Sequence, residues 1–141
     1  MSEQTNPAGG FWDDVPIIHS YTRAEALADG ALIDVTETAK EAGFSVPVAV
    51  TSAVWADCIK WTDADSERQT HQDEAGRLWD VVFMTMWAAK RAPRGDTVAV
   101  ELYRVPRGGT GKQARLVRLV AKIGPGDKGE PVLTIMQPDE D

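Results

Sequence analysis

The sequence predicts an α+β domain in which several short helices and one long central helix pack on a three-stranded antiparallel β-meander. Two observations lead to this fold class. Apolar residues follow the 3.6-residue period of a helix at residues 51–61 and 77–92, and they alternate with a period of two near the end of the 141-residue chain. Turns rich in glycine and proline separate the alternating stretches, as expected for consecutive antiparallel strands.

Capping signals predict two short helices at the start of the folded part. Thr22 and Glu25 fit a capping box, and Gly30 stands where a left-handed residue ends a helix. The start signal recurs at Asp34, and Gly43 provides the next stop. The helices are expected at residues 23–29 and 36–42, and residues 32–33 are expected to add a short edge strand.

Apolar periodicity predicts two further helices. Trp55 and Ile59 share a stripe of a helix expected at residues 51–61. The strongest pattern covers residues 77–92, and its wide apolar arc favours a nearly central helix that Pro93 ends. The side chains expected in the core are Trp55, Ile59, Trp79, Val82, Phe83, Met86, Trp87, Val100, Leu119 and Ile135.

The strands of the meander are expected at residues 97–105, 114–123 and 131–136. The very polar residues 62–75 read as a loop with at most one helical turn. Residues 1–15 are polar and contain glycine and proline, so we expect them to be flexible. Residues 16–141 are then expected to form one domain.

Composition favours a soluble protein of the cytoplasm. The formal net charge is −7, and no apolar run has the roughly 18 residues of a membrane span. The first residues lack the basic and apolar regions of a signal peptide, so we expect no export. Cys58 is the single cysteine, which excludes an internal disulfide and favours a reducing compartment.

Charge is divided along the chain in a way that suggests two contact surfaces. Residues 1–75 carry 14 acidic and 4 basic residues, whereas residues 77–128 carry 4 acidic and 11 basic residues. Clustered charge of one sign accelerates encounters with a complementary partner. The predicted partner-binding residues are the aromatic anchor Trp61 and the acidic Asp63, Asp65, Glu67, Asp73 and Glu74. A secondary basic patch is predicted at Arg104, Arg107, Lys112, Arg115, Arg118 and Lys122.

Familiar catalytic and cofactor motifs are incomplete. The glycine-rich loop at residues 108–112 lacks the first glycine and the Ser/Thr of a phosphate-binding loop. Cys58 could pair with His19 or His71, but it lies on an apolar helical stripe where a small buried side chain is the simpler interpretation. An EF-hand that began at Asp63 would have arginine in place of its glycine. We therefore expect no cofactor and no metal.

Several strings resemble a small uncharacterised family, a domain of unknown function carried by bacterial plasmids, phages and other mobile elements. These strings include SYTRAEALADGALIDV, GRLWDVVFM and GPGDKGEPVLTIMQPDED. Many small acidic proteins of mobile elements inhibit host defence, so the resemblance implies a non-enzymatic anti-defence inhibitor, either anti-CRISPR or anti-restriction. Its expected partner is a host defence protein or nucleoprotein complex, and no membrane is involved.

Two other functions remain open from the residues. One is a small hydrolase or transferase with a polar cleft, because polar side chains stand within otherwise apolar strings. The residues of this cleft would be Tyr21, Arg23, Asp34 and Asp80. The other is nucleic-acid binding by the basic meander, although the net negative charge opposes unspecific affinity for phosphate backbones.

Overall fold

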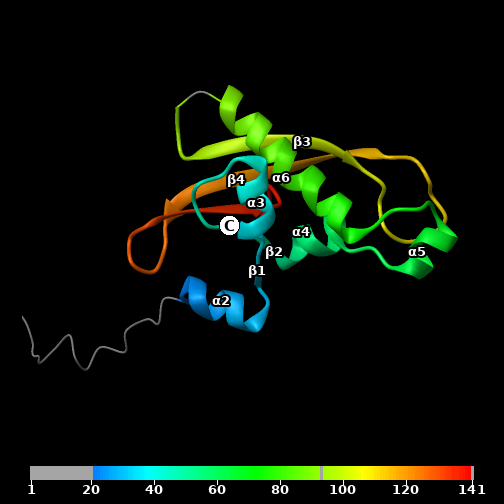
Figure 1. Cartoon of the computed structure of the whole chain (residues 1–141), viewed down its shortest axis with the longest axis horizontal. Helices are drawn as coiled ribbons and strands as arrows, with labels where there is room; N and C mark the ends of the chain where they lie inside the picture. Colours follow the sequence, from blue (N-terminus) through cyan, green and yellow to red (C-terminus); the bar gives the residue numbers. More distant parts are fainter. Residues whose placement is uncertain (1–20, 93, 141) are drawn as a thin grey trace, which may run out of the picture.

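The computed structural model describes residues 21–92 and 94–140, in which α3 and α6 pack side by side on one face of a five-stranded sheet (Figure 1). The prediction for residues 1–15 and the position of His19 lie outside the described residues. The elements in chain order are α2 Arg23–Asp29, β1 Leu32–Asp34, α3 Thr36–Ala42, β2 Val48–Thr51, α4 Ser52–Val54, the π-helix η1 Trp55–Ile59, α5 Asp63–Arg68, α6 Glu74–Arg91, β3 Thr97–Arg104, β4 Arg115–Pro125 and β5 Pro131–Met136.

The sheet is mixed, with strand order β1-β2-β5-β4-β3. Strands β3, β4 and β5 form the predicted antiparallel meander, but β5 also pairs in parallel with β2, and β2 pairs antiparallel with β1. The α+β class is therefore confirmed, but the sheet has five strands rather than the three of the predicted meander. Strand β3 lies at one edge, and β1 lies at the other edge as predicted.

Strand β2 was missed because its residues are apolar without alternation. Val48, Ala49 and Val50 are all buried, since β1 and β5 flank the strand and α3 covers it. A short continuous apolar run of this kind cannot be told from a buried helix by its period. The first residues of β2 thus read as the approach to the helix expected at residues 51–61.

The helix expected at residues 51–61 is shorter than predicted and is not a regular α-helix throughout. The Thr51 hydroxyl caps the single turn of α4 by accepting from the Val54 N–H at 3.2 Å. The chain then widens into the π-helix η1, whose Lys60 N–H donates to the Trp55 carbonyl at 2.8 Å. The segment that follows, expected to be a loop, contains α5, which a second capping box between Thr62 and Asp65 starts.

The signals for the first two helices are confirmed in their main features. Thr22 and Glu25 form the capping box of α2, which ends at Gly30 with a φ of 86°. Gly43 ends α3 with a φ of 114°, again in the left-handed region. Asp34 is not the N-cap of α3, which is Val35, although the Asp34 carboxylate accepts from the Thr36 N–H at 3.1 Å.

The core lies between α3, α6, η1 and the sheet. Five predicted core residues are fully buried: Ile59, Val82, Val100, Leu119 and Ile135. Trp55 is partly buried, as is Met86. The prediction is wrong for Trp79, Phe83 and Trp87, which are exposed. Helix α6 turns Val81, Val82 and Thr85 inward, and its aromatic residues fall on the remaining side.

Candidate functional site

The acidic segment is folded into the molecule at Asp65. Its carboxylate is completely buried and forms ion pairs with Arg68 and Arg107, both at 2.6 Å. It also accepts from the Thr62 N–H at 2.8 Å, as part of the capping box. The hydrogen bond from Arg107 is the main cause that lowers the pKa of Asp65 to about 2. The expectation of an exposed contact is therefore wrong for Asp65, because the basic loop after β3 satisfies it.

Gln69 fastens the same loop to the end of α5. Its amide nitrogen donates to the carbonyls of Pro106, at 2.9 Å, and Gly111, at 2.6 Å. Its amide oxygen accepts from the Gly108 N–H at 2.9 Å. No pattern in the sequence predicts this role for Gln69. The acidic segment and the basic loop, predicted as two separate contact surfaces, are thus bound to one another.

Trp61 is buried, with 4% of its surface exposed, so its prediction as an exposed anchor is wrong. Its indole N–H donates to the Ser66 hydroxyl at 3.0 Å, and its backbone N–H donates to Glu74 at 3.2 Å. The Arg77 guanidinium lies over the ring, 4.5 Å from its centre. Trp61 therefore stabilises the junction between α5 and α6.

Arg77 is a buried cation whose partners are mostly backbone carbonyls. Its guanidinium donates to Ile59 O at 3.1 Å, to Val105 O at 3.0 Å and to the Gln72 side chain at 2.7 Å. Burial lowers the pKa of Arg77, but arginine keeps its charge in proteins. The side chain thereby satisfies the carbonyl end of η1 and ties it to the end of β3.

The other acidic candidates divide between structural and exposed positions. Asp73 caps α6 by accepting from the Gly76 N–H at 2.7 Å. Glu74 accepts from Trp61, as described above. Asp63 and Glu67 are exposed on α5. Only part of the predicted acidic surface is therefore available to a partner.

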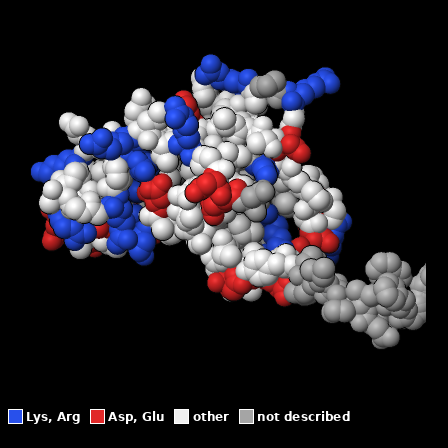
Figure 2. Space-filling model, turned by 180° about the vertical axis from the view of Figure 1, so that it is seen from behind, with Lys and Arg blue, Asp and Glu red and all other residues white. Residues whose placement is uncertain are grey.

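The basic candidates are likewise divided. Arg104 pairs with Asp57 at 3.0 Å, Arg107 pairs with Asp65, and Arg118 pairs with Glu101 at 2.8 Å. Lys112 and Arg115 lie exposed on the connection between β3 and β4 and at the start of β4. Figure 2 shows Lys and Arg gathered at the end of the molecule that this hairpin forms.

The polar residues proposed for a catalytic cleft lie in two places. Arg23 donates to Thr134 at 2.7 Å and, with Tyr21, lines a hollow beside α2. The Tyr21 hydroxyl donates to Asp29, which raises the pKa of Tyr21 to about 12. Asp34 lies near enough to raise the pKa of Arg23, although burial lowers it more. Asp80 instead lines a separate hollow beside Arg77.

Cys58 is buried, and its burial together with the nearby Asp57 raises the pKa of the thiol to about 12. A thiol with this pKa is protonated at neutral pH and is a poor nucleophile. Among residues 21–92 and 94–140, no three His, Cys, Asp or Glu side chains are grouped to hold a metal ion. In the same described ranges, no helix is long and apolar enough to cross a membrane.

The outer side of α6 carries three exposed aromatic residues at a spacing of four. Trp79, Phe83 and Trp87 are 36%, 44% and 51% exposed, and we call them the aromatic face. The rings of Trp79 and Phe83 stack with their centres 5.8 Å apart. The Arg91 guanidinium lies 5.6 Å from the centre of the Trp87 ring. The face is thus arranged by ring stacking and a cation–π contact.

A groove of about 780 Å³ runs between α6 and the edge strand β3. Met84, Trp87 and Arg91 line its helical side, and residues 97–101 line its strand side. Because β3 is the last strand of the sheet, no further strand among residues 21–92 and 94–140 pairs with its outer side. The aromatic face and this groove meet at Trp87 and form the best candidate for a functional surface.

Comparison with known proteins supports a family but names no activity. No curated protein and no solved structure matches the chain. A family model matches residues 9–141, which is nearly the whole sequence. The chain belongs to this family, DUF6573, a family of unknown function.

Proposed function

We propose that this protein is a non-enzymatic binding protein whose aromatic face is the centre of its interface. The observation that carries the proposal is the exposure of Trp79, Phe83 and Trp87 on one side of α6. Tryptophan is enriched among the residues that dominate binding energies, and interfaces contain more aromatic residues than other surfaces do. Grouped apolar side chains that the fold leaves uncovered typically mark a contact site.

The surroundings of the aromatic face support this interpretation. Arg91 lies over Trp87, and arginine is also enriched in interfaces. The adjoining groove would accept a segment of the partner beside β3, where unpaired backbone groups can bond to an added strand. Helix and strand are packed on the core, so the surface is largely formed before binding, which lowers the entropy cost.

The partner class that we propose is a host defence nucleoprotein complex, such as a CRISPR effector or a restriction enzyme. This part rests on the resemblance to proteins of mobile elements, which we propose as the source of the family. Inhibition would result from occupancy of a surface that the complex needs. Exposed Asp63 and Glu67 would contribute charge at the rim, where they affect the association rate more than the final affinity.

Binding to purified defence complexes, measured by biolayer interferometry, tests the proposal. The double variant Phe83→Ser/Trp87→Ser is expected to weaken binding by about a hundredfold or more, since interface aromatics commonly contribute at least 2 kcal/mol each. The matched control is Tyr103→Ser/Leu116→Ser. These two paired residues are also exposed, but they alternate with the buried Leu102 and so lie on the face of the sheet away from α6.

Three outcomes would contradict the proposal in different ways. Binding that survives the α6 double variant moves the interface away from the aromatic face. Equal losses in both double variants indicate a broad apolar effect rather than a specific surface. Absence of binding across the complexes of the host removes the proposed partner class.

Nucleic-acid binding by the hairpin end remains a second candidate because Lys and Arg gather there (Figure 2). Three of its arginines are already paired with carboxylates, which reduces the charge available for phosphates. A gel-shift experiment at low salt with the wild type and Lys112→Gln/Arg115→Gln tests this function. No retention of DNA or RNA by the wild type would eliminate it.

A further inference from the structure

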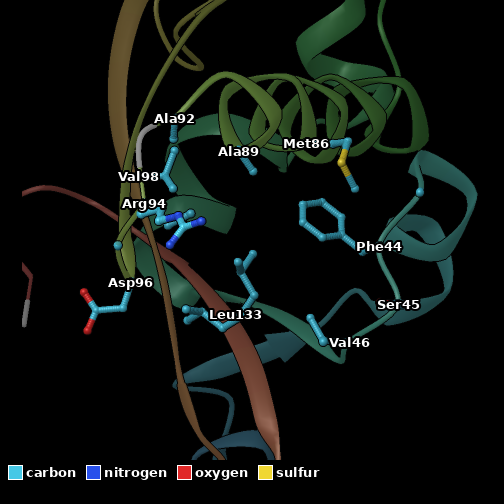
Figure 3. Close-up of a pocket in the computed structure, with 14 residues that line it drawn as sticks. Phe44, Ser45, Val46, Met86, Ala89, Ala92, Arg94, Asp96, Val98 and Leu133 are labelled. Atoms are coloured by element: carbon cyan, nitrogen blue, oxygen red, sulfur yellow. The ribbon is translucent and has the colours of Figure 1, made fainter.

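Another hollow, of about 440 Å³, opens between the last turns of α6, the loop at residues 43–46 and the sheet (Figure 3). Its walls are mainly apolar, and Phe44, Met86 and Leu133 face it from three different elements. None of the aromatic face lines it. Its volume is in the range of pockets that bind small molecules.

Small side chains create this space, and packed elements hold it open. Ala89 from α6, Ala92 at the C-cap of this helix and Ala121 from β4 line the hollow where longer side chains would fill it. The loop wall lies close against α6, since a Cβ added at Gly43 would come within 3.3 Å of the Met86 methyl group. The hollow is therefore part of the folded state and does not need a ligand to open it.

Arg94 supplies a positive charge at this apolar site. Its guanidinium points into the hollow, whereas the Asp96 carboxylate points away (Figure 3) and accepts from the Thr97 hydroxyl at 3.1 Å. Within residues 21–92 and 94–140, no carboxylate pairs with Arg94. An arginine remains charged at any physiological pH, so an anion is the complementary group.

The surroundings favour an anion with a single charge. Helix α6 ends at Arg91, and its last carbonyls present the negative end of the helix dipole beside the hollow. These carbonyls would repel a doubly charged phosphate more strongly than a singly charged anion, and Arg94 is the one cation among the described residues that line the hollow. A carboxylate matches the planar donor pair of the guanidinium with one negative charge.

We propose that this hollow binds a medium-chain aliphatic monocarboxylate, with the carboxylate on Arg94 and the tail against Phe44, Met86 and Leu133. The tail displaces water from apolar walls, and the guanidinium fixes the orientation of the molecule. This site is independent of the proposed function, since none of the aromatic face lines it, although Ala92 and Val98 border both the hollow and the groove beside β3.

Isothermal titration calorimetry tests the site with octanoate below its micelle concentration. The expected result is binding that weakens about tenfold in Arg94→Gln, because a hydrogen bond to a charged group is lost. Lys90→Gln, exposed in the last turn of the same helix and outside the lining of the hollow, is the matched control and should bind as the wild type does. Ala89→Phe should abolish binding by filling the space, and circular dichroism checks that each variant is folded.

Two related probes separate the roles of charge and tail. Octanol has the same tail without the charge, so it should bind the wild type and Arg94→Gln equally. Hexanoate, which is two methylenes shorter, should bind roughly tenfold more weakly than octanoate, since each buried methylene contributes about a three- to fourfold change in affinity.

Some results would overturn the inference. Failure of octanoate to bind the wild type would do so, as would equal affinity for wild type and Arg94→Gln. Tighter binding of octyl phosphate than of octanoate would replace the carboxylate by a different anion. Loss of binding in Lys90→Gln alone would move the site away from Arg94.

Discussion

The junction around α5 buries its tryptophan, whereas the aromatic face of α6 leaves its tryptophans exposed. Trp61 belongs to a very polar stretch, yet it is 4% exposed, whereas Trp87 belongs to the most apolar helix and is 51% exposed. The polar stretch packs against the rest of the molecule because Asp65 forms an ion pair, and Gln69 forms hydrogen bonds, with the loop after β3. No described element covers the aromatic face. Coverage by the rest of the chain, rather than local polarity, thus decides which side chains are available to a partner.

The largest difference between the two regions should appear in the stability of two alanine variants. Trp61→Ala is expected to lower the free energy of unfolding by about 3–5 kcal/mol, because it empties a packed site and leaves Arg77 without its aromatic contact. Trp87→Ala should cost about 1 kcal/mol or less, since half of that side chain is already exposed. Urea unfolding measures both, and equal losses would contradict the contrast.

Arg77 should be nearly as important as the tryptophan beneath it. Arg77→Met keeps much of the volume but leaves the Ile59 and Val105 carbonyls unpaired, so we expect a loss of about 2–4 kcal/mol. Arg115→Met, on the exposed start of β4, is the control and should stay within about 0.5 kcal/mol of the wild type. A similar small effect at Arg77 would show that water satisfies these carbonyls.

The ion pairs of Asp65 should give the α5 junction a pH dependence. The folded pKa of about 2 is below the ordinary value of 3.8, so the ionised carboxylate stabilises the fold at higher pH. This contribution should be complete above about pH 5 and should disappear as the pH falls from about 4 to about 2. The stability difference between wild type and Asp65→Asn should shrink over the same interval, as measured by urea unfolding at several pH values.

Asp63→Asn is the control for this pH dependence, because Asp63 lies exposed at the first position of the same helix. Because Asp63→Asn keeps the ion pairs of Asp65, its free energy of unfolding should still fall between pH 4 and pH 2. If the difference in the free energy of unfolding between Asp65→Asn and the wild type stays constant down to pH 2, the Asp65 carboxylate does not cause the pH dependence.

The smallest expected effect concerns the aromatic face itself. A double-mutant cycle with Trp79→Ala and Phe83→Ala should give a coupling energy of about 0.5–1 kcal/mol for the stacked pair. Water reaches both rings, so the coupling should be at the low end of aromatic pairs. A coupling of zero would mean that the rings do not hold each other in place before a partner binds.

Much of the secondary structure could be predicted because its signals are local. The capping box at Thr22 and the glycines at positions 30 and 43 act within one helical turn, and the alternation of β3 and β4 is a property of consecutive residues. The split helix after Thr51 was less predictable, since the carbonyl of Ile59 at the end of η1 is satisfied by Arg77 from α6. The candidate site was predicted poorly, because burial on a helix depends on which neighbours cover it.

The sequence by itself determined the α+β class, the order of the later strands and the amphipathic character of α6. A periodic pattern states which residues share a side of a helix or strand, and this follows from backbone geometry alone. Only the tertiary structure decided that β2 would pair in parallel with β5, that the loop after β3 would bury Asp65 and that α6 would turn Val82 rather than Phe83 inward. These choices depend on contacts between residues far apart in the chain, whose partners no local pattern identifies.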